Sequence, residues 1–293
     1  MKISILQMPV AFARPDDNIK TLRRMVAKAM RAEPDVLVLP ELWRLGFYPQ
    51  PIAVHADLDG QQSRTVLAEL ARTNGVNIVG GTVANRREGK VYNTCYIFDR
   101  TGTEVASYDK AHLFSPSGES KDFAAGREMV TFRLDGVLCG IAICYDVRFP
   151  EFIRKLALED IAVLFLPAAW PASRLSHWQT LTRARAIENQ FYVIAANEAG
   201  TDEQGNHLAG HSAILDPWGE AIVEAGESEA ILPACAPACA TTSARPSTSS
   251  PTAAPSSTEH CYQKDCRKTR QSFSLSHYYT LKRKLTTSPS CMT

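Results

Sequence analysis

Short apolar runs alternate with longer amphipathic stretches along residues 1–232. The runs end at Gly, Pro or polar residues, which is typical of buried strands, whereas the stretches repeat apolar residues at helical spacing. The predicted strands are Lys2–Met8, Val36–Leu39, Asn77–Thr82, Val91–Phe98, Glu104–Tyr108, Val130–Leu134, Val137–Ile143, Val163–Pro167, Phe191–Asn197, His211–Leu215 and Ala221–Ala225. The predicted helices are Pro15–Ala32, Gln61–Asn74, Pro150–Leu158 and His177–Asn189.

The order of these elements predicts an α/β fold. Some strands are separated by helices and others are joined as hairpins, for example around Asp135-Gly136. Both kinds of connection in one chain favour a mixed sheet covered by helices. No fixed-period repeat is visible, so the pattern does not indicate a solenoid or a propeller. Gly80-Gly81 is interpreted as part of a strand, not as a phosphate-binding loop.

Composition divides the chain at residue 232. Residues 233–293 hold eight Lys/Arg and two Asp/Glu, a net charge of +6, whereas 1–232 carry −5. The last 61 residues contain five of the eight cysteines but no Val, Ile, Gly, Asn or Trp. We therefore predict a folded domain over 1–232 and a low-complexity tail over 233–293.

The averages exclude several classes of protein. A formal net charge of +1 gives no support for a nucleic-acid partner. No apolar run approaches the roughly 18 residues of a membrane span. The N-terminal residues enter a strand-like run without a signal-peptide pattern, so a cytoplasmic location is expected.

Three chemically capable residues follow predicted strands. Glu41, Lys110 and Cys144 each stand where an apolar run ends, and strand ends are where α/β folds present their chemistry. A surface charge or a packed thiol is the alternative for any one of them taken alone. Cys95 and Cys139 lie inside strand patterns and are interpreted as small buried hydrophobic residues.

Three sequence blocks resemble the signature motifs of the nitrilase (carbon–nitrogen hydrolase) superfamily. They are Pro40-Glu41-Leu-Trp, Asp109-Lys110-Ala-His-Leu-Phe114 and Cys144-Tyr-Asp-Val-Arg-Phe-Pro-Glu151, in the family's order. The Cys-Tyr-Asp block is similar to that of ω-amidase-like and small aliphatic amidases. Further stretches agree, among them Trp170-Pro-Ala-Ser-Arg174 and Gly118-Glu119-Ser120.

The resemblance implies a four-layer αββα sandwich and a Glu–Lys–Cys site without metal or cofactor. Glu41 would be the general base, and Cys144 the nucleophile that forms a thioester with an amide substrate. Lys110 and the backbone N–H of Tyr145 would stabilise the oxyanion. Glu119 matches a second glutamate that orients substrate and lysine, with an ordinary loop acid as the alternative. Intact relatives are expected to be homodimers or larger homo-oligomers.

The substrate is predicted less directly. Arg148 either pairs with a substrate carboxylate or forms an ion pair with Glu151 or another local acid. Trp170 either lines the pocket or belongs to the core, and His112 is interpreted as a structural hydrogen-bonding residue. A short ω-amide of a dicarboxylic acid is preferred. The alternatives are an N-carbamoyl-amide or nitrile hydrolase and a non-catalytic, amidase-like interaction protein.

The tail lacks the C-terminal motif expected from the resemblance, close to V-F-x-x-R-R-P-x-L-Y. Reading one base out of frame with GC-rich wobble bases, from Ala240 to Thr258, yields D-D-V-R-A-A-L-D-V-F-A-D-R-R-P-E-L-Y. We therefore hypothesise that the coding sequence shifts frame near Leu232–Pro233. The five tail cysteines and the basic residues 282–284 would then need no functional explanation. An intact natural frame through codons 225–262 would contradict this hypothesis.

Overall fold

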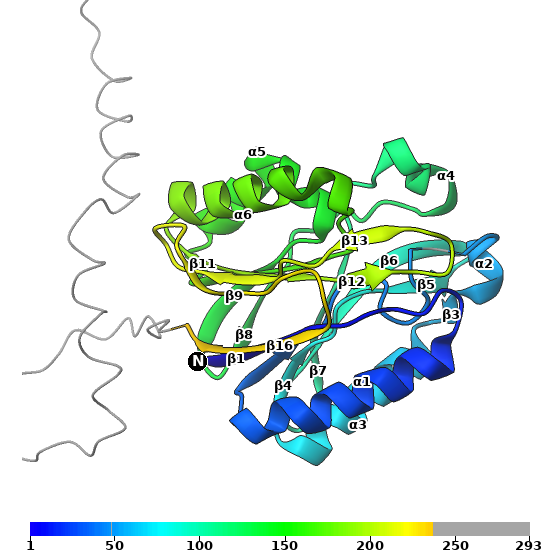
Figure 1. The fold of residues 1–293 in the computed structure, drawn as a ribbon, viewed down its shortest axis with the longest axis horizontal. Coiled ribbons are helices and arrows are strands. Elements are labelled where there is room, and N and C mark those ends of the chain that lie inside the picture. The colour runs from blue at the N-terminus through cyan, green and yellow to red at the C-terminus, as the bar shows by residue number, and fades with distance from the viewer. Residues whose placement is uncertain (48, 237–293) are drawn as a thin grey trace, which may run out of the picture. The chain divides into compact units, whose positions relative to one another are not determined.

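The computed structural model describes residues 1–47 and 49–236. All but the first four residues of the predicted tail therefore lie outside the described residues. Two sheets stacked face to face dominate the described part of the chain (Figure 1).

The first sheet contains both termini of the described chain. Its strands run in the order β16-β1-β2-β4-β6-β5-β3, and β7 also pairs with β6. The central pairs β1–β2 and β2–β4 are parallel, whereas β16 pairs antiparallel with β1. The strands are β1 (Lys2–Gln7), β2 (Val36–Val38), β3 (Asp57–Leu58), β4 (Asn77–Val79), β5 (Val83–Arg87), β6 (Lys90–Phe98), β7 (Glu104–Asp109) and β16 (Ala230–Cys235).

The second sheet carries the nucleophile candidate after one of its central strands. Its order is β15-β14-β11-β10-β9-β8, with β9, β10 and β11 parallel. The strands are β8 (Thr131–Leu134), β9 (Val137–Ile141), β10 (Val163–Ala168), β11 (Tyr192–Asn197), β14 (Ala213–Leu215) and β15 (Ala221–Glu224). A separate hairpin joins β12 (Ala199–Thr201) to β13 (His207–Ala209).

Helices cover the outer face of each sheet. Figure 1 shows α1 and α3 beside the first sheet and α5 and α6 beside the second, which confirms the predicted αββα layering. The longer helices are α1 (Pro15–Ala29), α3 (Gln61–Asn74), α5 (Pro150–Leu158) and α6 (Leu175–Asn189). The shorter ones are α2 (Ile52–His55), α4 (Glu119–Asp122) and the 3-10 turns η1 (Met30–Ala32), η2 (Ser115–Ser117), η3 (Cys144–Arg148) and η4 (Ala172–Arg174).

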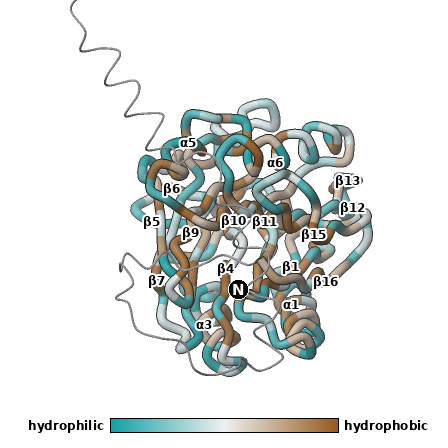
Figure 2. The backbone as a smooth tube through the Cα atoms, turned by 90° about the vertical axis from the view of Figure 1, so that its left-hand side faces the viewer, coloured by the Kyte–Doolittle hydropathy of each residue, from teal (hydrophilic) through white to brown (hydrophobic). Residues whose placement is uncertain are grey.

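Alternation along β2 explains why both faces of the first sheet are apolar. Val36 and Val38 belong to the core between the sheets, together with Phe165 of β10. Leu37 points the other way, into the core beneath α1 and α3. Successive side chains of a strand point to opposite faces, so a strand buried on both sides reads as a continuous apolar run. Figure 2 shows these hydrophobic segments gathered in the central strands.

The observed strands differ from the predicted ones in several places. The strand predicted over Asn77–Thr82 ends at Val79, so Gly80-Gly81 lies in the connection to β5 and not within a strand. β5 (Val83–Arg87) and β16 (Ala230–Cys235) were not predicted. β16 crosses residue 232 and pairs Cys235 with Lys2. Pro233 is tolerated there because β16 is an edge strand, where a missing N–H costs no ladder bond.

Candidate active site

Cys144 is the first residue of the 3-10 turn η3, at the sharp turn that follows β9. Its backbone has φ +45°, a left-handed conformation that a side chain with a Cβ rarely adopts. The carboxylate of Asp146 holds the turn by accepting a hydrogen bond from the N–H of Ile143 at 2.8 Å. The turn therefore presents the sulfur of Cys144 from a rigid backbone.

Glu41 follows β2, and its loop is held by the connection after β4. Gly81 lies so close to this loop that an added Cβ would stand 2.0 Å from the Pro40 carbonyl. The N–H of Thr82 donates to the same carbonyl, and the Thr82 hydroxyl accepts from the N–H of Leu42. The loop on both sides of Glu41 is thus tied to one neighbouring segment.

Lys110 follows β7 and is buried together with the two carboxylates. Its Nζ donates to Glu41 Oε1 at 2.8 Å and to Glu119 Oε2 at 2.9 Å. Asn93 on β6 donates its Nδ2 to Glu41 at 2.8 Å and to Glu119 at 3.0 Å. The backbone N–H of Ala169 donates to Glu41 at 2.8 Å, and the backbone N–H of Phe114 donates to Glu119 at 2.6 Å.

The electrostatics of this cluster favour a charged lysine. Burial lowers the pKa of Lys110, but Glu41, Glu119 and Cys144 outweigh it and raise that pKa well above its usual value. Burial in turn raises the pKa of Cys144, and the charge and hydrogen bond of Glu41 raise it further, while Lys110 acts in the opposite direction. Cys144 therefore rests as a thiol and needs a base before it can attack a substrate.

Asp146 links the lysine loop to the cysteine turn. Besides Ile143, its buried carboxylate accepts from the hydroxyl of Tyr108 at 2.8 Å, and from the backbone N–H of His112 at 2.9 Å. The His112 ring nitrogen Nδ1 lies 2.8 Å from the same carboxylate, and the ring stacks on Phe149. This confirms His112 as a structural hydrogen-bonding residue.

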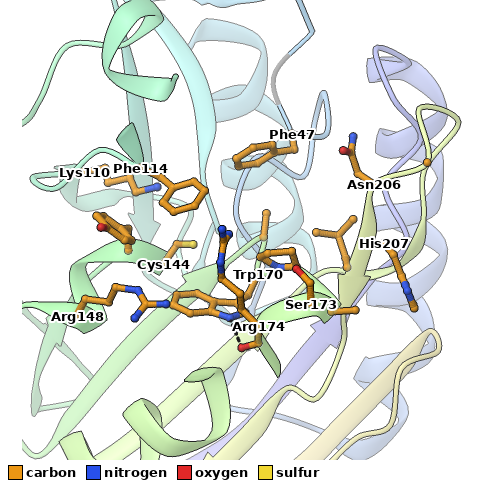
Figure 3. Close-up of a pocket in the computed structure, with 16 residues that line it drawn as sticks. Phe47, Lys110, Phe114, Cys144, Arg148, Trp170, Ser173, Arg174, Asn206 and His207 are labelled. Atoms are coloured by element: carbon orange, nitrogen blue, oxygen red, sulfur yellow. Dashed lines mark hydrogen bonds between the residues drawn. The ribbon is translucent and has the colours of Figure 1, made fainter. Parts of the chain in front are cut away.

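A pocket of about 600 Å³ opens beside Cys144 (Figure 3). Lys110, Tyr145, Arg148 and Trp170 contribute to its wall, so Trp170 is both 3% exposed and a pocket residue. Aromatic and polar residues from other segments complete the wall, among them Phe47, Phe114, Ser173, Arg174, Asn206 and His207. A volume of this size suits a small-molecule ligand.

Arg148 does not form an ion pair with Glu151 or with another acid of the described chain. Its hydrogen-bond partner among these residues is His177. Its guanidinium contacts the ring of His177 and the faces of Tyr145 and Trp170. Its charge is therefore left available at the pocket.

Sequence reasoning missed Asn93, which touches both carboxylates from the middle of β6. It also assigned no role to Asp146, although the residue stands two positions after Cys144. Asn93 lacks any local signal because its role depends on segments 52 and 26 residues away.

Among residues 1–47 and 49–236 there is no group of three His, Cys, Asp or Glu side chains that could hold a metal ion. The same residues include no helix long and apolar enough to cross a membrane.

A nucleophilic side chain, a buried carboxylate and a buried cation at one pocket are the groups that covalent amide hydrolysis requires. The family model described as carbon–nitrogen hydrolase matches residues 2–238. The chain belongs to the carbon–nitrogen hydrolase family, and it is an enzyme of the amidase type.

Comparison with individual proteins agrees with this assignment. The chain is 45% identical over 232 residues to a 2-oxoglutaramate amidase of Bacillus subtilis, covering 79% of this chain and 89% of that protein. A carbon–nitrogen hydrolase superfamily structure from Xanthomonas campestris, with an arsenic adduct in its active site, has a TM-score of 0.76 at 31% identity and covers 80% and 89% of the two chains. An amidase from Nesterenkonia, with acrylamide added at its active-site cysteine, has a TM-score of 0.75 at 26% identity and covers 82% and 94%.

Proposed function

We propose that this amidase hydrolyses the terminal amide of a short, carboxylate-bearing substrate through a thioester on Cys144. The observation that carries the proposal is the placement of Cys144 beside the buried Lys110–Glu41–Glu119 cluster, at a pocket that the guanidinium of Arg148 also lines. Relatives named 2-oxoglutaramate amidase and omega-amidase support the substrate class.

In the first half of the reaction Glu41 takes the proton from the Cys144 thiol, and the sulfur attacks the amide carbon. Negative charge moves to the carbonyl oxygen, where Lys110 and the N–H of Tyr145 stabilise it. Glu119 keeps Lys110 in place with two further hydrogen bonds. When the tetrahedral adduct collapses, Glu41 returns the proton to the nitrogen and ammonia leaves.

The second half of the reaction uses the same groups in reverse. Glu41 takes a proton from water, and the resulting hydroxide attacks the thioester carbon of acyl-Cys144. The second oxyanion is stabilised by the same donors. The carbon–sulfur bond then breaks, the thiolate recovers the proton from Glu41, and the carboxylic acid product departs.

In the pocket Arg148 would hold the substrate carboxylate, and Trp170 would form the wall along the substrate's carbon chain. The guanidinium fork suits a carboxylate because it can donate two parallel hydrogen bonds. The catalytic cysteine would attack the amide at the other end. An N-carbamoyl amide or a nitrile remains the alternative substrate, and a non-catalytic interaction protein the alternative from another class.

The test is an ammonia-release screen on ω-amides, N-carbamoyl acids and nitriles, combined with trapping of the acyl-enzyme and mass spectrometry. We expect release from ω-amides and an adduct on Cys144 that is absent in Cys144→Ala. Release from carbamoyl acids or nitriles alone would replace the proposed substrate class. The absence of both ammonia and adduct with every compound would favour the hypothesis of a non-catalytic interaction protein.

The domain division, the cytoplasmic location and the homo-oligomer are proposals as well. The comparison to make is between this chain and a version with the restored reading frame. If residues 233–293 replace a segment that packs on the sheet and across a subunit interface, the restored version should melt higher and be the larger assembly in light scattering. A monodisperse dimer with full amidase activity from the unrestored chain would contradict this expectation.

A further inference from the structure

Two arginines line the pocket beside Cys144. Among the described residues, Arg148 and Arg174 line it together with apolar and neutral polar side chains, and no Asp or Glu belongs to its wall. Lys110 is the third cation of the wall, but it is already paired with Glu41 and Glu119. The excess positive charge of the pocket therefore resides on the two guanidinium groups.

Arg148 is held in place by neutral partners. Its Nη2 lies 3.0 Å from Nδ1 of His177, the third residue of α6. Because a guanidinium can only donate, this ring nitrogen must be the acceptor. The guanidinium also lies 5.0 Å from the centre of the Trp170 ring and 5.8 Å from that of Tyr145. These contacts orient the group without neutralising it.

Arg174 reaches the same cavity from the turn η4. Figure 3 shows its side chain directed into the cavity, and its guanidinium lies 5.1 Å from the centre of the Phe114 ring. In the described part of the chain this guanidinium has no hydrogen-bonded acid. The backbone carbonyl of Arg174 accepts a 2.8 Å hydrogen bond from the Trp170 indole, so Arg174 also fixes the ring on which Arg148 lies.

Resting on the proposed function, we infer that Arg148 and Arg174 form a two-guanidinium clamp for the substrate carboxylate, and that His177 is the positioning residue that holds Arg148 in the clamp. A carboxylate between two guanidinium groups can accept hydrogen bonds from both. An acid in place of His177 would hold Arg148 equally well but would take its charge. The neutral imidazole orients the arginine and leaves the charge for the substrate.

The first experiment varies residue 177 and measures KM and kcat for two matched substrates, succinic acid monoamide and butyramide. The two differ by a carboxylate in place of a methyl group. The readout is the KM for succinic acid monoamide divided by the KM for butyramide. His177→Gln keeps an acceptor and should leave this ratio within about threefold, whereas His177→Glu should raise it about tenfold or more through ion pairing with Arg148. An unchanged or lower ratio in His177→Glu would overturn the role of His177.

The second experiment varies residue 174. Arg174→Gln should raise the same KM ratio about tenfold, because one charged donor to the carboxylate is lost. Arg133→Gln is the matched control, since Arg133 is exposed on β8 and donates to the Gly136 carbonyl. Equal ratios in Arg174→Gln and Arg133→Gln would overturn the clamp.

Calorimetry with succinate separates failure of the clamp from failure of the proposed function. The clamp predicts that the wild-type chain binds succinate and that Arg174→Gln and His177→Glu each weaken binding about tenfold. Succinate binding of this kind without ammonia release from any amide would leave the clamp standing and remove the proposed function. Amide hydrolysis without succinate binding would support the proposed amidase activity and overturn the clamp.

Discussion

The Nζ of Lys110 lies 2.8 Å from Oε1 of Glu41, and neither side chain is exposed to solvent. Removing charges from water costs several kcal/mol each, so such a pair persists only with further hydrogen bonds around it. Asn93, Glu119 and the backbone of Ala169 supply them here. The result is a pre-organised base and cation beside Cys144.

Lys110→Met should destabilise the protein as well as inactivate it. The substitution leaves Glu41 and Glu119 buried without their shared cation, and breaking a buried pair on one side costs about 3–5 kcal/mol. Urea denaturation should show this loss at pH 7. Lys155→Met on α5, where the lysine is exposed, is the control and should change stability by less than about 0.5 kcal/mol. Equal stability of the two variants would contradict the prediction.

Asn93→Ala should lower kcat about 10- to 100-fold and change KM little. The side chain donates to both carboxylates, so its loss frees Glu41 and Glu119 to shift relative to Cys144. Asn85→Ala is a matched control, because Asn85 is buried on the neighbouring β5 and its Nδ2 donates to Thr94. A similar loss of kcat in both variants would point to general disturbance of the sheet.

Asp146→Asn should reduce both stability and kcat. The four groups around the carboxylate all donate hydrogen bonds to it. In the variant, the amide NH2 would replace one of the two acceptor oxygens and would face one or more of these donors. The mismatch should cost about 1–3 kcal/mol and loosen the turn that carries Cys144. Thermal melts and steady-state kinetics would measure the two effects. A variant with wild-type kcat would show that the turn keeps its shape without this carboxylate.

Stability should fall at alkaline pH, in part because of Cys139. Burial raises the pKa of this thiol from 9.0 to about 12. Between these values the folded protein keeps the proton and the unfolded chain releases it, so the free energy of unfolding falls by about 1.4 kcal/mol per pH unit. Urea melts between pH 9 and 10.5 should show that the free energy of unfolding falls less steeply with pH in Cys139→Ala, by about this amount. Cys235→Ala is the control at an exposed position, and a slope as shallow there would contradict the assignment.

Much of the secondary structure followed from local pattern. The helices Gln61–Asn74 and Pro150–Leu158 have the predicted bounds, because each has an apolar face and a clear start or stop residue. β5 was missed because Val83-Ala-Asn-Arg-Arg87 becomes polar after two residues. β16 was missed because its pairing with β1 depends on a segment more than 200 residues away.

The sequence by itself determined the chemical groups: Glu41, Lys110 and Cys144 stand at predicted strand ends within recognisable motifs. It also determined the mixed α/β class, through the period of its apolar positions, whereas the four-layer αββα arrangement was implied by the resemblance of its motifs to the carbon–nitrogen hydrolase superfamily. Only the tertiary structure decided which groups meet. Lys110 and Glu41 are 69 residues apart, and Asn93, Asp146, His177 and Arg174 gain their roles from neighbours on other elements. The physical reason is that local spacing governs which face of a strand or helix is buried, whereas contacts between side chains on different elements depend on how the sheets pair and stack.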